Sequence, residues 1–211
     1  MSHILFGTVN TKAYGLIVAP YEIPMPLPRT DYVEIPGRNG TLDLSEAYGS
    51  VLYQDRIIPI TLYAIGTYDT ALSNFVNAVH GKRMQITFSK DQTWFYNGRV
   101  NVSAISKQPG YCEIGLEITA EPYKLAQTET KVSRTGNGSV TLTNGQMPVV
   151  PVITNTKAAT LTFTYQGASM TVSLSAGTHT VPALALGENE SKSVTITSEG
   201  KVTFAFRKGR L

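Results

Sequence analysis

The sequence is poor in the residues that build disulfides, metal sites and membrane spans. Cys112 is its only cysteine, so the chain cannot form an internal disulfide. The three histidines, His3, His80 and His179, are too scattered for a zinc-ligand pattern. No apolar run approaches the roughly 18 residues of a membrane helix, and no basic segment followed by an apolar one opens the sequence. We therefore expect a soluble protein without a classical export signal, a metal site or a membrane partner.

Charge is also scarce. Charged residues make up 16% of the 211 residues, against about a quarter in a typical soluble domain. The net charge of +3 is small, and the only basic cluster lies at Arg207 to Arg210, so nucleic-acid binding through phosphate neutralisation is not expected. The polar surface is instead rich in hydroxyls, with 26 threonines. Because β-branched threonine fits a pleated surface, this composition favours strands.

The composition changes near residue 130. Residues 1–130 hold 15 of the 19 aromatic residues and carry 10 basic and 12 acidic side chains, a net charge of −2. The remaining residues carry 8 basic and 3 acidic side chains, a net charge of +5. Such a shift predicts two domains, which we place at 1–128 and 129–211.

The first domain is predicted to be a β-barrel or sheet. Residues 112–120 alternate strictly between apolar and polar side chains, which predicts a strand with one wet face. Residues 56–63 alternate similarly, and Pro59 indicates an edge position or a local irregularity there. Residues 84–88 and 94–102 are predicted to form two more strands.

Residues 68–81 are predicted to form the only substantial helix. Thr67 or Asp69 is available as an N-cap, and Gly81 is placed to end the helix. The apolar residues of this segment fall at helical spacing: Leu72, Phe75, Val76 and Val79.

The second domain is predicted to be a small β-sandwich or barrel of short strands and turns. Apolar residues alternate in 161–165 and in 170–174, on either side of Gln166-Gly167, which predicts a hairpin. A second hairpin is predicted to join residues 194–196 to residues 202–206. The expected fold is therefore mainly β, a sheet domain with one helix followed by a β-sandwich.

No arrangement of residues predicts catalysis. Glu113 and Glu117 share a strand face, but four residues at about 3.3 Å each separate them by roughly 13 Å, beyond the 5 to 9.5 Å or so of a glycosidase carboxylate pair. Cys112 lies on the apolar side of its strand and is predicted to be a small buried hydrophobe. There is no Gly-x-Ser-x-Gly elbow and no phosphate loop. We predict no catalytic residue, no cofactor and no enzymatic activity.

Two segments are candidate binding features. Trp94-Phe95-Tyr96 could form a stacking platform for bases or sugars, but the strand period turns alternate members towards the core, and we favour the core. In the stretch from Ile35 to Leu44, two glycines bracket Arg38-Asn39, so the backbone is predicted to turn tightly and present Arg38 outward. A guanidinium on a turn suits a carboxylate across an interface.

The stretch from Ile35 to Asp43 resembles the Val-Pro-Gly-Arg-Asp-Gly-type signature of the distal tail proteins of long-tailed, non-contractile bacteriophages (siphophages). Asn39 stands in place of the signature's aspartate. Further landmarks fall in the family's order over nearly the whole chain: Tyr14-Gly15-Leu16, the helix at 68–81, Glu121 to Lys124, Pro148 to Ile153, Leu186 to Asn189 and Val202 to Arg207.

The resemblance implies a structural virion protein, a distal tail hub. Its N-terminal domains would form a hexameric ring with a channel for DNA passage, and its galectin-like β-sandwiches would point outward. The ring would join the tail tube to the tail tip or baseplate and contact the tail-associated fibre or lysin protein, with the tape measure protein as a further candidate partner. Such a protein is assembled in the host cytoplasm and acts in host attachment. Inter-subunit or tube contact is expected at the glycine turn: Gly37, Arg38, Asn39 and Gly40.

The alternative is a carbohydrate-binding β-sandwich that contacts the host cell wall. A sugar site usually requires an exposed aromatic platform, and the second domain offers only Tyr165 and three phenylalanines, the latter on strand phases assigned to the core. A glycan array with residues 131–211 distinguishes the two, because saturable binding favours the sugar module.

Overall fold

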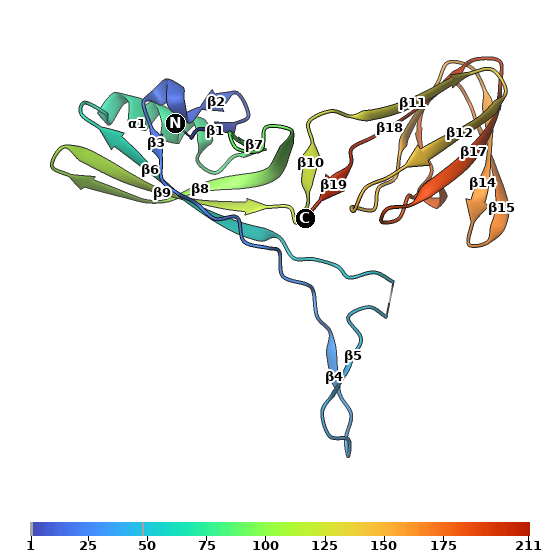
Figure 1. The fold of residues 1–211 in the computed structure, drawn as a ribbon, viewed down its shortest axis with the longest axis horizontal. Helices are drawn as coiled ribbons and strands as arrows, with labels where there is room; N and C mark the ends of the chain where they lie inside the picture. The colour runs from blue at the N-terminus through green and yellow to red at the C-terminus, as the bar shows by residue number, and fades with distance from the viewer. Residues whose placement is uncertain (1, 48) are drawn as a thin grey trace. The chain divides into compact units, whose positions relative to one another are not determined.

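The computed structural model describes residues 2–47 and 49–211. The chain divides into two compact units, Met1–Lys124 and Leu125–Leu211, whereas the sequence analysis placed the division after residue 128. Strands dominate both units, and one α-helix lies in the first, so the mainly β fold class is confirmed (Figure 1). None of the described helices has the length and apolar character needed to cross a membrane.

Unit 1 is built on a sheet with the strand order β2-β1-β7-β8-β9-β6-β3. Its elements are β1 (Ile4–Phe6), β2 (Val9–Asn10), the short 3-10 helix η1 (Thr11–Tyr14), β3 (Ile17–Val18), β4 (Tyr32–Glu34), β5 (Thr41–Asp43), β6 (Arg56–Ile65), α1 (Asp69–Val79), β7 (Arg83–Phe88), β8 (Trp94–Gln108) and β9 (Tyr111–Ala120). The strands β4 and β5 pair only with each other, apart from this sheet.

The centre of the unit 1 sheet is the antiparallel ladder between β6 and β9. It runs without a register shift from Arg56 opposite Ala120 to Ile65 opposite Tyr111. Alternate residues of both strands are buried, as the period of two predicts. Pro59 lies where β6 has a partner on one side only, because β3 pairs with it no further than Leu62. This matches the predicted edge position.

Helix α1 covers one face of this sheet. It buries Leu72, Phe75 and Val79, as the helical spacing predicts, and the Phe75 ring packs edge-on against Phe6 at 6.0 Å between centroids. The predicted N-cap was wrong. The cap position is Tyr68, whose side chain makes no cap bond, and the Asp69 carboxylate lies in the first turn and accepts from Lys107.

The end of α1 follows the sequence prediction. Gly81, with φ of +71°, comes directly after the C-cap residue His80, and a left-handed glycine stops a helix without steric cost.

Unit 2 is a sandwich of two four-stranded antiparallel sheets. One has the order β11-β18-β13-β16 and the other β12-β17-β14-β15. The strands are β11 (Thr130–Thr135), β12 (Gly138–Thr143), β13 (Val152–Asn155), β14 (Ala159–Tyr165), β15 (Ala168–Leu174), β16 (Gly177–Thr180), β17 (Ser191–Ser198) and β18 (Lys201–Phe206). A short 3-10 helix, η2 (Pro182–Leu184), precedes β17, and β19 (Gly209–Arg210) pairs with β10 (Lys124–Ala126).

The first predicted hairpin of unit 2 is confirmed. Strands β14 and β15 pair from Ala159 opposite Leu174 to Tyr165 opposite Ala168. Gln166 and Gly167 both have positive φ, 50° and 80°, as a two-residue turn of this kind requires.

The second predicted hairpin was wrong. Strands β17 and β18 follow each other along the chain but belong to different sheets, so the segment between them crosses from one sheet to the other. A hairpin and a crossing both give strands with alternating apolar residues, so the pattern does not separate them. Side-chain bonds hold the crossing, with Ser198 Oγ donating to Ala158 O at 3.0 Å and Gly200 N donating to Ser198 Oγ at 3.1 Å.

The core of the sandwich contains all three phenylalanines of unit 2. Phe163, Phe204 and Phe206 are at most 3% exposed, so none of them forms a surface platform, while Tyr165 is 41% exposed. The period-two pattern therefore predicted the core positions of the phenylalanines correctly.

The outer face of the β12-β17-β14-β15 sheet carries hydroxyl side chains alone. Three cross-strand pairs bond at 3.0 to 3.2 Å, for example Ser139 with Thr195. Every outward position of these strands is serine or threonine: Ser139, Thr141, Thr143, Thr160, Thr162, Thr164, Ser169, Thr171, Ser173, Ser191, Ser193, Thr195 and Thr197. Much of the threonine excess in the composition is explained here.

The crossing at Gly200 provides a stability test. A Cβ on Gly200 would lie 2.6 Å from Thr156 Oγ1 and 2.9 Å from the backbone N of Lys157, so Gly200→Ala should destabilise unit 2 by about 1–3 kcal/mol. Hydrogen exchange of β17 and β18 peptides measures the loss. Gly187→Ala is the control, because there the nearest atom is the end of the flexible Glu190 side chain at 3.3 Å. Equal loss of protection in both variants would contradict the close packing.

Candidate functional site

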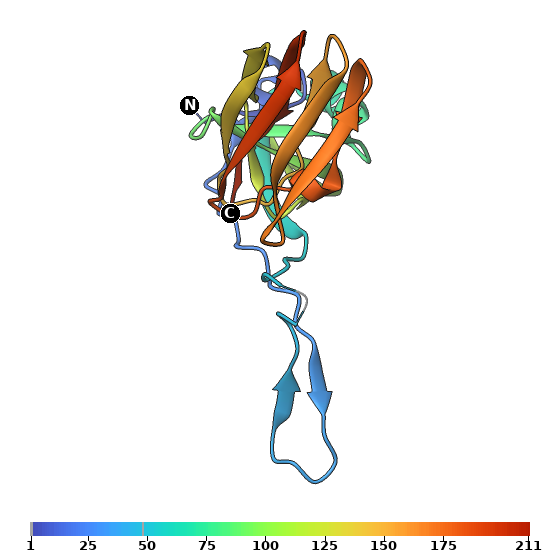
Figure 2. The same cartoon turned by 90° about the vertical axis from the view of Figure 1, so that its right-hand side faces the viewer.

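The candidate site is a long arm, residues 21–55, between β3 and β6. The arm leaves the sheet, and its two limbs run antiparallel to a turn at the tip (Figures 1 and 2). Near the base, Arg29 N donates to Leu52 O at 2.7 Å and Gln54 N donates to Leu27 O at 2.8 Å. Further out, β4 pairs with β5 from Tyr32 opposite Asp43 to Glu34 opposite Thr41.

All four predicted site residues lie at the tip of this arm. Gly37 and Gly40 have φ of +80° and +77°, a left-handed conformation that glycine adopts freely. Arg38 N donates to Ile35 O at 3.1 Å, which closes the turn, and the Arg38 and Asn39 residues are exposed. The turn surrounds a hollow of 430 Å³ that Arg38 and Gly40 line, whereas Gly37 and Asn39 do not.

A serine-centred network stiffens the arm beyond β5. Ser45 donates to Asp43 Oδ1 from both its backbone N and its Oγ, and its Oγ accepts from Asp31 N at 2.9 Å. These bonds favour the ionised carboxylate, so they hold the pKa of Asp43 below its usual value.

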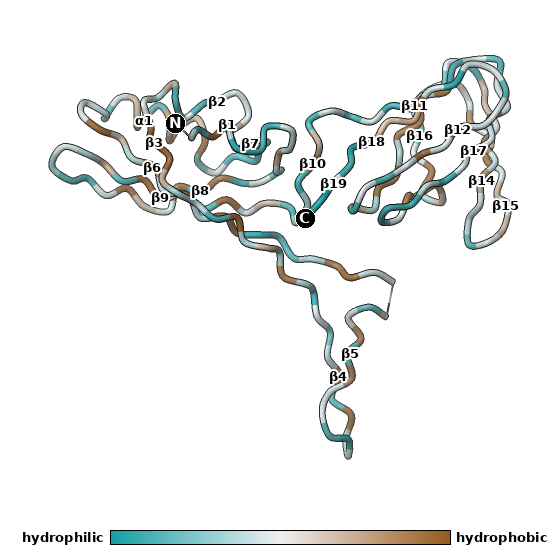
Figure 3. Tube along the Cα trace, viewed as in Figure 1, coloured by the Kyte–Doolittle hydropathy of each residue, from teal (hydrophilic) through white to brown (hydrophobic). Residues whose placement is uncertain are grey.

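The arm exposes an unusual amount of apolar surface for a segment without a core. Two-stranded hairpins are marginally stable alone in water, and contiguous exposed apolar residues mark interaction sites. Figure 3 shows hydrophobic segments along both limbs. The large apolar side chains that are 39% to 66% exposed here are Met25, Leu27, Tyr32, Val33, Ile35 and Leu52. Exposed apolar surface of this kind is typical of an interaction site.

The charge of the arm differs in sign from that of the body of unit 1. Residues 21–55 contain six acidic and two basic side chains, a net charge of −4. The other residues of 1–124 contain eight basic and five acidic side chains, a net charge of +3. The arm and the body therefore carry net charges of opposite sign.

A buried arginine anchors the base of the arm. Arg56, 3% exposed, donates to the carbonyl oxygens of Pro24 and Pro122 and lies over the Tyr96 ring at 5.1 Å from its centroid. Burial lowers the pKa of the guanidinium below its ordinary value, although the group stays cationic. The sequence analysis did not single out Arg56. The sequence did contain a signal for its burial, because Arg56 lies two residues before Ile58 and therefore on the same inward face of the strand.

The other sequence candidates lie elsewhere. Phe95 and Tyr96 are 2% and 5% exposed, so they are core residues and form no stacking platform. Cys112 is buried, which raises the pKa of its thiol. Glu113 and Glu117 are exposed on the face of β9 opposite the core. Over residues 2–47 and 49–211, no three His, Cys, Asp or Glu side chains gather in a way that could hold a metal ion.

The chain consists of two β units, one with a helix and a long arm and the other a sandwich. No protein-family model and no curated protein matches the chain. Among solved structures, it is similar to the crystal structure of the SPP1 Dit protein (gp 19.1), a paradigm of the hub adsorption apparatus in phages that infect Gram-positive bacteria. The match covers 100% of both chains with a TM-score of 0.71 and 13% sequence identity. A likeness at this identity establishes a common fold.

The Arg56 anchor can be tested by substitution. Arg56→Met keeps the stem but removes the buried donor to the carbonyls of Pro24 and Pro122, and unit 1 should lose about 1.5–3 kcal/mol of unfolding free energy. Urea titration followed by the fluorescence of Trp94, the only tryptophan of the chain, reports on unit 1. Arg83→Met removes an exposed ion pair with Glu121 and should cost under about 1 kcal/mol. Similar losses in both variants would remove the anchoring role.

Proposed function

We propose that the chain is a distal tail hub protein of a siphophage. The observation that carries the proposal is the common fold with the SPP1 hub protein over the full length of both chains. The ordered landmarks of the same family in the sequence support it independently. On this proposal the protein is a structural component of the virion tail, assembled in the host cytoplasm, and it catalyses no reaction.

Unit 1 forms the hexameric ring. The arm supports this assignment, because its exposed apolar residues and its net charge of −4 match a body of opposite charge. A head-to-tail contact of this kind closes into a ring when the rotation between copies allows it. Arg38 is exposed at the tip, on a turn fixed by Gly37 and Gly40. Its guanidinium pairs with a carboxylate of the neighbouring subunit or of the tail tube.

The ring encloses the channel for DNA. We assign the lumen to the sheet face opposite α1, where Glu113 and Glu117 are exposed beside Thr119. Arg99 is exposed on the same face, opposite Thr119, but the carboxylates of Glu113 and Glu117 keep this face from being strongly electropositive, so DNA would slide past it. A cryo-EM ring with a strongly electropositive lumen would contradict this part of the proposal.

Unit 2 points outward as the galectin-like domain. The tail tube lies on one side of the ring and the tail-associated fibre or lysin protein on the other, with the tape measure protein as a further candidate partner. Burial of Phe163, Phe204 and Phe206 leaves Tyr165 as the one exposed aromatic among the described residues of unit 2, which weakens the carbohydrate-binding alternative.

Native mass spectrometry tests the ring. We expect the purified chain to form a hexamer, alone or on addition of its tip partner. Arg38→Ala should raise the concentration at half-assembly about tenfold, since loss of one charged hydrogen bond is worth about 1.5 kcal/mol. Lys12→Ala, which removes another exposed cation of unit 1, should leave assembly unchanged. A persistent monomer would refute the hub, and equal effects of the two variants would refute the contact at Arg38.

A further inference from the structure

Four asparagines of the chain are followed directly by glycine: Asn39, Asn97, Asn137 and Asn144. Such a pair can react with itself in water, which makes asparagine a thermolabile residue. The backbone N of the glycine attacks the side-chain amide carbon, and ammonia leaves, carrying the proton that the backbone N gives up. Water then opens the five-membered succinimide to aspartate or isoaspartate. Glycine allows this ring closure because it has no Cβ and its backbone is conformationally free.

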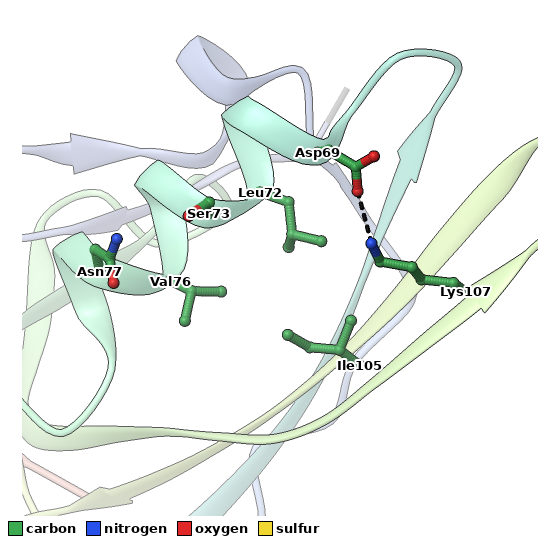
Figure 4. A pocket seen from close by; sticks show the side chains of 7 residues that line it. All are labelled: Asp69, Leu72, Ser73, Val76, Asn77, Ile105 and Lys107. Atoms are coloured by element: carbon green, nitrogen blue, oxygen red, sulfur yellow. Dashed lines mark hydrogen bonds and ion pairs between the residues drawn. The ribbon is translucent and has the colours of Figure 1, made fainter.

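Regular secondary structure fixes the backbone of the Asn97 pair. Gly98 lies opposite Met84 of β7 and opposite Ala120 of β9, so strands hold it on both sides. Ring closure turns the backbone of the asparagine away from the extended form, and Asn97 cannot make that turn without leaving the sheet. A helix has the same effect on an exposed asparagine outside these pairs, because alanine follows Asn77 and α1 fixes its backbone (Figure 4).

Side-chain hydrogen bonds hold the two asparagines of unit 2. Asn137 is exposed, but its Oδ1 accepts from Ser198 N at 2.9 Å. Asn144 is 5% exposed, and its Nδ2 donates to Met147 O at 2.7 Å and to Gly187 O at 2.9 Å. Each amide has to break these bonds before its carbon can meet the backbone N that follows. Both asparagines therefore react only when unit 2 opens locally.

The Asn39-Gly40 pair at the tip of the arm has no such restraint. Asn39 is exposed, and among the described residues neither its side chain nor the backbone N of Gly40 makes a hydrogen bond. The tip joins β4 and β5, which pair with each other and with no other described strand. Because a two-stranded hairpin opens at little cost, the amide carbon of Asn39 is free to meet the backbone N of Gly40.

We propose that Asn39 and Gly40 form a self-modifying site, at which the free chain converts Asn39 to aspartate or isoaspartate. Residues 35–42 contain a single charged side chain, that of Arg38. A carboxylate at position 39 therefore changes the net charge of this tip from +1 to zero, and isoaspartate also lengthens the backbone within the turn. The conversion requires no partner subunit, so this inference goes beyond the proposed hub function and does not rest on it.

Peptide mass spectrometry of the aged chain tests the site. The purified full chain is kept for days in mildly alkaline buffer, which favours loss of the proton from the attacking nitrogen, and a second sample is unfolded in guanidinium chloride. In the folded chain we expect Asn39 to convert at least about tenfold faster than Asn97, Asn137 and Asn144, because these react only through local opening. Unfolding should bring the four rates within a few-fold of one another, because the same Asn-Gly chemistry then applies to each.

Two variants identify the residue that reacts. Asn39→Gln keeps the amide, but closure then requires a six-membered ring and is slow, so the acidic species that forms first on ion-exchange chromatography should disappear. Asn137→Gln, at the other exposed asparagine of the four, should leave that species unchanged. Equal rates at all four asparagines of the folded chain, or an acidic species that persists in Asn39→Gln, would overturn the site.

Discussion

The pairing of β6 with β9 is the constraint on which the rest of unit 1 depends. Its register holds over the ten residues of β6 without a bulge, and a slip of one residue would turn every apolar side chain to the opposite face. The register decides which face α1 covers and sends Arg56 inward at the first position of β6. The arm begins next to that residue, so its base is fixed by the same ladder.

The buried Arg56 and the exposed arm both follow from the pairing of β6 with β9. A guanidinium without a carboxylate partner is costly to bury, and here the backbone carbonyls of Pro24 and Pro122 and the Tyr96 ring compensate that cost. The base of the arm is thereby fixed to the body of unit 1, while the limbs beyond it keep their apolar side chains in water. An arm of this kind loses little conformational entropy at its root when a partner covers it.

Periodic segments were predictable from sequence, and pairing choices were not. The alternation in β9 and the spacing of Leu72, Phe75 and Val79 predicted both elements because each reports a local period. The crossing after Ser198 was missed because a hairpin has the same local pattern. The turn at Gly37 to Gly40 was found from its glycines, whereas the anchor at Arg56 was not, because its partners Pro24 and Pro122 are distant from it in sequence.

The hydroxyl face of unit 2 has a consequence for the conditions under which the protein works. None of the outward side chains on the β12-β17-β14-β15 sheet gains or loses a proton at ordinary pH, and none carries a charge that salt can screen. Hydration of this face therefore stays the same from acid to alkaline media and from dilute to saline ones. Any contact made there would be governed by shape and hydrogen bonding, insensitive to the ionic composition of the surroundings.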